Sequence, residues 1–472
     1  MNEIYEKILI KIGKQPDFSS KKIKLTNVTL NLTFCSPIIS DFNINEFLPR
    51  ITNVENIYDI ENYFKEKVPL AKFIEVTNFT MAESLLFGGF ILINVGKYLY
   101  GFESRGPIDR SISESTTEVT IHGSKEALNE SYNSNIALVR KRIKSLNLNL
   151  NEHIIGRYTK TRIGILSIKN ISSKELIADI EKRLSKIDID GIFDSHYIEE
   201  LIIPEKDPIP TCIKTEKPDL VCEALLEGKV VIITENSPVA LIIPSLFIDF
   251  FHVPEDYYQK SINVSFTRMI RIFAFFTAII LPGLYLGITT YNPEIIPTKL
   301  FLAFASQRSS IAFPSIAEAL FMILAFEIIK ESDTRFPSSV GSALSIVGGL
   351  VLGEAAVSAG LVSPIMIIVI AISTISGLVF SNMDMINAIR FYRLIFIAFA
   401  LLLGTPGIYI GIIFFILKIS SMNTFGKPFL YPFAPLYLNK KDVIFRQSRK
   451  KLNKRDEILV QRNRTRYKER EI

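Results

Sequence analysis

The sequence predicts a soluble α/β N-terminal domain of two lobes, followed by an α-helical transmembrane domain of four to five membrane-embedded segments. The chain has 472 residues, of which 48% are hydrophobic and 22% are charged. Its mean hydropathy is +0.27, which a charged soluble part joined to an apolar membrane part explains. Up to about residue 265 we find no stretch that is apolar and uncharged over the length a membrane helix needs, whereas long apolar stretches follow.

Within the soluble part, helical and strand patterns alternate, which favours an α/β arrangement. FILINV and KYLYGF are typical of strands, and residues 229–244 predict a hairpin that turns at Glu235–Pro238. Apolar residues at helical spacing after Ser124, a suitable N-cap, predict a helix that joins the lobes. The predicted units are a first lobe over 1–123, a connecting helix over 124–147, a second lobe over 148–265, a transmembrane domain over 266–420 and a basic C-terminal tail over 421–472.

The predicted membrane segments are 272–291, 315–329, 340–363, 365–380 and 394–417. Lys260, Arg268 and Arg271 precede the first segment, so the positive-inside rule places the soluble domain on the cytoplasmic side. The tail from Lys440 onward carries a net charge of +8, because 13 Lys or Arg residues face 5 Asp or Glu residues. Five crossings cannot return this tail to the same side. We therefore expect that 315–329 does not cross, or that the chain reverses at Gly404–Gly407.

Several functional classes lack support in the sequence. It contains no GxxxxGK[ST] or GxGxxG loop, and its four histidines have no metal-ligand spacing. The three cysteines, Cys35, Cys212 and Cys222, form no CxxC pair and are read as reduced thiols. We expect no cofactor, no metal site, no nucleic-acid binding and no enzymatic activity. The basic tail either binds anionic lipid head groups or is a disordered solubilising segment.

An acidic residue, Glu354, lies inside the apolar stretch GGLVLGEAAVSAG. A carboxylate at mid-membrane costs at least about 2.5 kcal/mol, so such acids usually face a bundle interior or a watery cavity. At about 100° per residue, a ridge of small residues forms one side of the helix predicted over 341–361 and can pack against a neighbouring helix. The ridge comprises Gly341, Ser345, Gly349 and Gly353.

The other side of this helix carries the acid among apolar residues, an arrangement typical of a helix that lines an aqueous path with an apolar constriction. The pore-lining candidates are Val347, Leu350, Val351, Glu354, Ser358 and Leu361. Several copies around an axis give a ring of carboxylates that attracts cations. Alternatively, Glu354 lies near the membrane interface, or is neutral and bonded to a neighbouring helix. Glu318 is a further acid that we expect to face a cavity.

Motifs along most of the chain, from about residue 27 to 438, resemble a known family. They include RSISESTTEVTIHGSKEALNESYNSNIALVRKRIK (110–144), GRYTKT, IDIDGIFDSHYIEELI, ALLEGKVVIITENSP, PEDYY, LPGLYLGITTYNPEIIPT, SIVGGLVLGEAAVSAGLVSP and FGKPFLYPFAPL. The sequence is identified by these motifs as similar to the A subunits of the spore germinant receptors, the GerA family. Departures include Ser115, His122, Ser124 and Leu128, where the family commonly has Pro, Arg, Pro and Phe, and Glu354, where it more often has Gln.

The resemblance implies an integral protein of the inner spore membrane that works with a transporter-like B subunit and a lipoprotein C subunit. Such A subunits are thought to form homo-oligomeric, nutrient-gated channels for monovalent cations. A non-conducting scaffold and a paralogous subunit beside the dipicolinate channel are the alternatives. Opposed charges in the first motif suggest a subunit interface, with Arg110, Glu114, Glu118, Arg140 and Arg142 as candidates.

Overall fold

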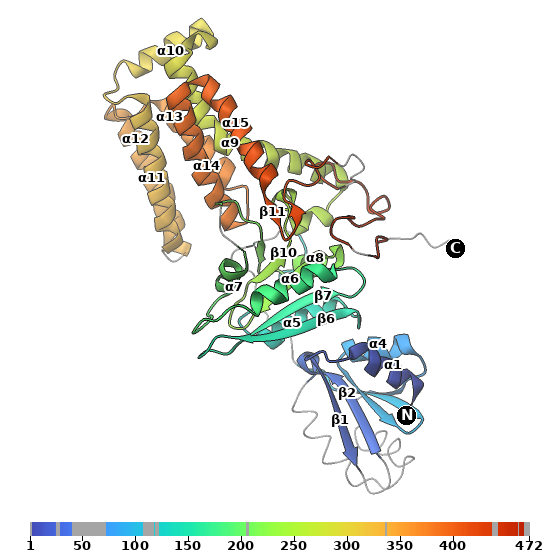
Figure 1. The fold of residues 1–472 in the computed structure, drawn as a ribbon. Helices are drawn as coiled ribbons and strands as arrows, with labels where there is room; N and C mark the ends of the chain where they lie inside the picture. Colours follow the sequence, from blue (N-terminus) through green and yellow to red (C-terminus); the bar gives the residue numbers. More distant parts are fainter. Residues whose placement is uncertain are drawn as a thin grey trace.

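The computed structural model describes residues 2–24, 29–39, 72–106, 118, 122–203, 207–335, 338–436, 442–460 and 462–466; of 333–335 and 338–347 it describes only the backbone. The soluble part forms the lower half of Figure 1 and a bundle of helices forms the upper half. The C-terminal segment, in dark red, lies beside the junction between them. The expected order of a soluble α/β part followed by a helical part is thereby confirmed.

The first lobe is built on an antiparallel sheet with strand order β1-β2-β4-β5-β3. Its strands are β1 (Phe18–Lys24), β2 (Thr29–Cys35), β3 (Phe73–Glu75), β4 (Phe90–Val95) and β5 (Tyr98–Glu103). Helices α1 (Glu3–Ile12) and α4 (Phe79–Phe87) pack on the sheet, where Ile8, Leu86 and Leu92 share one buried cluster. FILINV and KYLYGF are confirmed as strands, because they form the β4–β5 hairpin.

The second lobe is an antiparallel sheet with helices on both faces. Its strand order is β6-β7-β9-β10-β8. The elements are β6 (Leu148–Ile155), β7 (Thr161–Ile168), β8 (Ile213–Thr215), β9 (Val230–Thr234), β10 (Ala240–Ile243), α5 (Tyr132–Arg142), α6 (Lys174–Leu184), α7 (Ser195–Ile202) and α8 (Pro218–Glu227). Neighbouring residues of β9 point to opposite faces: Val231 packs with α5 and α8, and Ile232 packs with α6 and α7. The predicted hairpin is confirmed as β9–β10.

The connecting helix α5 starts later than the sequence predicts. Its N-cap is Ser131, which accepts a hydrogen bond from the backbone N–H of Ser134, and not Ser124. The preceding residues follow the second lobe instead, because the N–H of Leu128 bonds to the carbonyl of Glu216. The helix still joins the lobes, since its residues enter the buried clusters of both.

A buried arginine fastens α5 to the first lobe. Arg140 is 0% exposed, and its Nε lies 2.7 Å from Asp17 Oδ2. Its Nη2 donates to Gln15 Oε1 at 2.7 Å, and its Nη1 donates to the carbonyl of Leu148 at 2.9 Å. A single guanidinium therefore ties the loop between α1 and β1 to the beginning of β6, which planar arginine does better than lysine.

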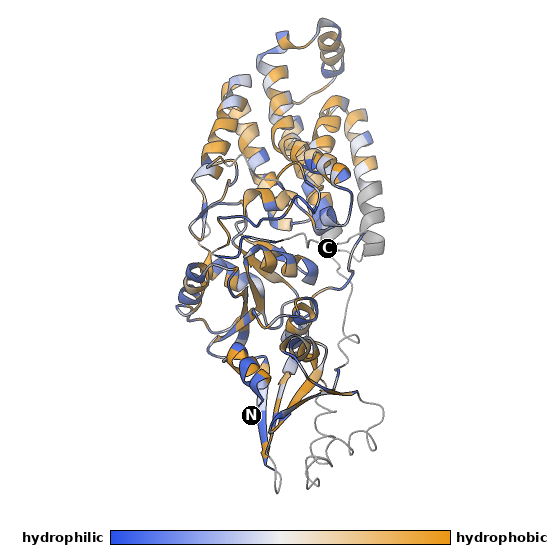
Figure 2. Ribbon diagram, turned by 90° about the vertical axis from the view of Figure 1, so that its right-hand side faces the viewer, coloured by the Kyte–Doolittle hydropathy of each residue, from blue (hydrophilic) through white to orange (hydrophobic). Residues whose placement is uncertain are grey.

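The helical region consists of antiparallel neighbours along one axis. Its helices are α9 (Ser261–Tyr291), α10 (Thr298–Arg308), α11 (Ser315–Arg335), α12 (Ser338–Ser358), α13 (Pro364–Gly377), α14 (Met383–Leu403) and α15 (Thr405–Ser421). Helix α10 lies at the end far from the soluble part (Figure 1). In the described chain, α9 and α14 are long and apolar enough to cross a membrane, and α13 and α15 are shorter apolar helices. Hydrophobic colouring covers much of this region in Figure 2.

Two of the predicted membrane segments, 394–417 and 315–329, have different bounds in the structure. The stretch 394–417 is not one span, because the chain reverses at Gly404 between α14 and α15. Gly404 has φ +65°, where an added Cβ would come within 2.8 Å of Tyr291, so glycine is required. Gly404 is the first residue of Gly404–Gly407, where a reversal of the chain is one of the two alternatives expected from the sequence. The other alternative is that the stretch 315–329 does not cross the membrane. This stretch lies within the longer helix α11.

The C-terminal segment packs on the rest of the chain where it is described, which differs from one of the two alternatives for the tail, a disordered solubilising segment. Leu452, Leu459 and Val460 are buried, and the last two enter the core of the second lobe against α8. Val460 forms a β-bridge with Ser172, and Arg466 pairs with Glu227. The segment therefore lies on the same side of the bundle as the soluble lobes.

Replacing Arg140 by Met is expected to destabilise the soluble part by about 3 kcal/mol, because Asp17 is left buried without its partner. For a soluble part of this size, the midpoint of thermal unfolding should fall by roughly 6–12 °C. Circular dichroism of the purified full chain measures this shift. The matched control is Lys141→Met on the same helix. Adding Asp17→Asn should recover part of the loss, and an unchanged midpoint for Arg140→Met would contradict the assignment.

Candidate functional site

The candidate pore face of α12 is exposed where it is described. Leu350 is 71% exposed and Val351 is 57% exposed. Glu354 and Ser358 are also exposed. All four lie on a part of the helix that no other described element of the chain covers. The side chain of Val347 lies outside the described residues.

The opposite side of α12 packs mainly against α11. Ala356 is buried, and Leu352 packs beside it on a cluster that includes Met322 of α11. Leu361 packs on the same cluster and lies beyond the last residue of α12, since the chain turns at Gly360 with φ +65°. Leu361 is therefore removed from the exposed face of the helix.

The predicted packing ridge is open at its described end. A Cβ added at Gly349 or Gly353 would have no atom within 4 Å. For Gly341 and Ser345 the structure describes only the backbone. Within one chain, the described ridge therefore has room for a closely packed helix that the chain itself does not supply.

Glu318 is buried and caps a helix. It is 1% exposed, and its Oε2 accepts hydrogen bonds from the backbone N–H of Ser363 at 3.0 Å and from the Ser363 hydroxyl at 2.9 Å. Ser363 is the N-cap of α13, so the carboxylate faces the positive end of the helix dipole. This placement differs from the cavity-facing position that we expected, and it links the start of α11 to the start of α13.

A single carbonyl oxygen in α9 connects three helices. Pro282 has no N–H, so the carbonyl of Ala278 loses its usual partner within the helix. Ser373 Oγ of α13 donates to this oxygen at 2.7 Å, and Arg393 Nε of α14 donates to it at 3.0 Å. The guanidinium also donates to the carbonyl of Ser373 at 3.2 Å. Proline thus creates the acceptor that a buried cation and a hydroxyl satisfy.

The predicted subunit-interface residues divide into three groups. Arg140 is buried inside the chain, so it leaves no exposed atom for a neighbouring subunit. Arg142 pairs with Glu126, and Glu118 accepts hydrogen bonds from Thr215 and the backbone of Glu216. Arg110 and Glu114 lie outside the described residues. The described candidates therefore make their polar contacts within one chain, and among them Arg142 pairs with an acid of the same motif.

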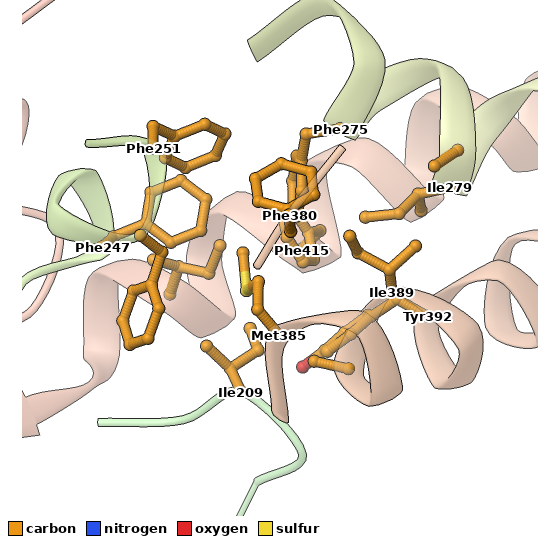
Figure 3. Packing of buried hydrophobic residues seen from close by; sticks show 14 of the residues in the cluster. Ile209, Phe247, Phe251, Phe275, Ile279, Phe380, Met385, Ile389, Tyr392 and Phe415 are labelled. Carbon is orange, nitrogen blue, oxygen red and sulfur yellow. The ribbon is translucent and has the colours of Figure 1, made fainter. Parts of the chain in front are cut away.

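A buried apolar cluster at the junction fixes the second lobe to the helices. This junction cluster includes Ile209, Phe247, Phe251, Phe275, Ile279, Phe380, Met385, Ile389, Tyr392 and Phe415. The 3₁₀ helix η3 (Phe247–Phe251) inserts its rings between α9 and neighbouring aromatic side chains (Figure 3). Phe251 lies 5.5 Å from Phe275 of α9 and 5.4 Å from Phe380, measured between ring centroids with edge-to-face geometry. Such pairs add roughly 0.5–1.5 kcal/mol each beyond their burial.

Ion pairs surround the junction cluster. Lys214 of β8 lies 2.8 Å from Asp384 of α14, and Lys418 of α15 lies 2.9 Å from Asp207. Each pair joins the second lobe to a different helix. The lobe therefore contacts the start of α14 and the end of α15 through both apolar packing and charge.

Asp256 joins three segments at the base of α9. It lies in η4 (Pro254–Tyr257), and its carboxylate is 2.9 Å from Arg268 and 3.0 Å from Arg271. Arg268 also lies 2.6 Å from Asp442, and Arg446 donates to the Asp256 carbonyl at 2.6 Å. Arg268, one of the cations that serve as sequence signals for membrane orientation, thus also forms part of the buried attachment of the C-terminal segment.

A cavity lies next to this network, between α8, η3 and the turn that precedes α14. Glu223 of α8 lines it and forms no hydrogen bond or ion pair with any part of the chain that the structure describes. Burial raises the pKa of Glu223 to about 7, although the positive charges of Arg466 and Arg449 oppose the effect; Asp442 and Asp219 add to it. Near neutral pH this carboxyl group therefore changes its charge.

Sequence reasoning missed the residues at the junction. PEDYY supported the family resemblance, but nothing in it reveals that Asp256 meets three segments. Ser373 and Arg393 give no signal alone; the available signal was Pro282, which predicts an unsatisfied carbonyl without naming its partners. Glu223 lies on a helix among other acids and has no distinctive spacing.

Two stacked α/β lobes fastened to a bundle of apolar helices, with acids and arginines placed inside that bundle, define a membrane protein that carries an N-terminal α/β domain. The comparisons with known proteins make this more specific. Residues 6–458 match the family model "Bacillus/Clostridium GerA spore germination protein". The chain belongs to the GerA family of spore germination proteins, the A subunits of germinant receptors, a family of receptor subunits rather than enzymes.

Two relatives in sequence support this membership. Spore germination protein KA of Bacillus subtilis (strain 168) is 35% identical, over 92% of this chain and 82% of that protein. The uncharacterized membrane protein YfkQ of the same organism is 34% identical, over 86% of this chain and 80% of that protein. The crystal structure of the N-terminal domain of the A subunit of the Bacillus megaterium receptor GerK3 is 27% identical, covers 52% of this chain and 94% of that chain, and gives a TM-score of 0.40.

Pro282 leaves the Ala278 carbonyl without its helical partner, and Ser373 donates to the same oxygen, so we expect their effects on stability to be coupled. Ser373→Ala should destabilise the helical region by about 1 kcal/mol, because one donor to this oxygen is lost. Pro282→Ala restores an N–H to the helix, so the same serine change should then cost less. A double-mutant cycle of thermal stability in detergent measures the coupling, expected at about 0.5–1 kcal/mol. Thr277→Ala is the control, and full additivity of Pro282→Ala with Ser373→Ala would refute the shared acceptor.

Glu223→Gln is expected to stabilise the protein at high pH. Because burial raises the pKa of Glu223 to about 7, the folded state carries an unfavourable charge above that pH, whereas both states are protonated below about pH 4. The variant should gain up to about 3 kcal/mol at pH 8, and this gain should shrink as the pH falls from 7 to below 5. Thermal unfolding at several pH values tests this. Glu175→Gln, an exposed acid on α6, should show no such pH dependence.

Proposed function

We propose that the chain is the membrane subunit of a spore nutrient germinant receptor and that several copies form a nutrient-gated channel for monovalent cations. The observation that carries this proposal is α12. Its polar face, with Glu354, and its small-residue ridge at Gly349 and Gly353 are both uncovered within one chain. A ring of copies would cover the ridge and leave the acid beside an axial path.

The course of the chain supports a topology in which both soluble parts are cytoplasmic, on the core side of the inner spore membrane. In the described chain, α9 and α11–α15 run along the bundle, which makes six helices and returns the C-terminal segment to the soluble side. Lys260 at the start of α9 fits the positive-inside rule on that side. Helix α10 would then lie at the outer surface.

Family membership supports partners for this subunit. A transporter-like B subunit would bind the nutrient, and a lipoprotein C subunit would complete the receptor in the lipid membrane. The soluble lobes are fastened to α9, α14 and α15 through the junction cluster and its ion pairs. A signal that moves the lobes would therefore reach the helices directly.

A non-conducting scaffold that couples a nutrient-binding partner to another channel is the second candidate, together with a paralogous subunit beside the dipicolinate channel. The packing of the lobes onto α14 and α15 favours a coupling role of this kind as well. Conductance separates the candidates: the purified chain in liposomes conducts monovalent cations if α12 lines a pore, and it conducts under no condition if the chain is a scaffold.

Glu354→Ala is expected to reduce germinant-triggered potassium release while the protein still assembles. Loss of a carboxylate ring lowers the local concentration of cations, so conductance in liposomes should fall roughly three- to tenfold at low salt and less at high salt. Val351→Ala should also change conductance by widening the apolar constriction. Ile375→Ala, an exposed residue of α13, is the matched control. Normal ion release from both α12 variants would show that this helix does not line the pore.

A further inference from the structure

The junction cavity is built by the soluble lobe, the helical region and the segment between them. Its walls come from α8, from β8 and β10, from η3, and from the turn at Ser381 and Asn382 that precedes α14. Asn382 is the N-cap of α14 and accepts a hydrogen bond from Met385 N at 3.1 Å. A molecule in this cavity would contact both the second lobe and the start of a membrane helix.

The size of the cavity restricts its ligand to a small molecule. Its volume is about 110 Å³, and an apolar cavity of roughly 150 Å³ takes up benzene. Leu220, Ile242, Phe250 and Val253 give it largely apolar walls. Such walls with a few polar groups are typical of sites for small organic ligands, whereas an inorganic cation needs a shell of oxygen ligands.

The charges that line the cavity are paired, with one exception. Lys229 lies 2.5 Å from Asp249, and Lys214 lies 2.7 Å from Glu199 and 2.8 Å from Asp384. These cations are already neutralised, which argues against an anionic ligand.

Glu223 is the exception among the acids of the cavity. Glu227 pairs with Arg466, and Glu118 accepts a hydrogen bond from Thr215. Glu223 has neither a hydrogen bond nor an ion pair with the described residues. The charge that the cavity leaves unpaired is therefore negative.

Two further groups suit a cationic ligand. His252 Nε2 lies 2.9 Å from the carbonyl of Val443; donating there leaves Nδ1 as an acceptor, and burial together with Arg268 lowers the pKa of this histidine, which keeps it neutral. The ring of Phe250 supplies an aromatic wall, which attracts an ammonium group by a cation–π interaction.

We propose that the junction cavity binds a small organic ammonium ion, with the Glu223 carboxylate as its counter-charge and Phe250 as its aromatic wall. The bound cation replaces the missing partner of Glu223 and bridges α8 to the turn before α14. This site does not depend on α12 lining a pore, because it lies in the soluble part of the junction.

Propylammonium is a suitable probe, with 1-propanol as an uncharged match of nearly the same shape. Saturation-transfer NMR on the full chain in detergent should detect propylammonium binding at millimolar concentration, with 1-propanol at least about tenfold weaker. Glu223→Gln should abolish this preference, and Glu175→Gln should preserve it. Phe250→Leu should reduce the preference without removing it.

The pH provides an independent readout. Because the Glu223 carboxyl must be ionised, propylammonium affinity should rise severalfold between pH 6 and pH 8 in the wild-type chain and stay constant in Glu223→Gln. Each of three results would overturn the proposal. These are equal binding of propylammonium and 1-propanol, propylammonium binding that is unchanged in Glu223→Gln, and no propylammonium binding at 100-fold the expected millimolar concentration. None of these outcomes bears on conductance, so the channel proposal is tested separately.

Discussion

The carboxylate of Asp256 is the point on which the attachment of the two halves of this protein depends. It receives Arg268 and Arg271 from the first turns of α9, while the backbone around it receives Arg446 from the C-terminal segment. A buried acid with two guanidinium partners is stable only while all of them are present. The second lobe, the first membrane helix and the described C-terminal segment are therefore one structural unit at this position.

The sequence predicts much of the soluble fold because its core strands are short apolar runs with clear turns between them. The β4–β5 and β9–β10 hairpins follow from such runs. The start of α5 does not, because Ser124 and Ser131 are equally good N-caps locally, and the choice is made by the distant backbone of Glu216. Likewise Leu459 and Val460 look like isolated apolar residues in a basic tail, and only the surface of α8 explains them.

For the membrane region, hydropathy predicts where helices lie but not how they end or meet. The uncharged stretch 394–417 is long enough for one span. The chain nevertheless reverses at Gly404, so the stretch is divided between α14 and α15. Glu318 and Glu354 look alike in sequence, since both are acids in apolar helices. One is buried on the start of α13 and the other is exposed. Such differences arise from tertiary contacts that periodicity does not encode.

The shared acceptor at Ala278 also bears on how this region can move. Helices α9, α13 and α14 meet at one oxygen atom, so none of them can slide along another without breaking two buried hydrogen bonds in a medium that offers no replacement. The hairpin of α11 and α12 has no comparable attachment among the described residues apart from the Glu318 cap and the pair between Glu327 and Arg390. Conformational change should therefore take the form of a rigid three-helix body about which the α11–α12 hairpin swings, with Gly360 and the Ser363 cap as its hinge.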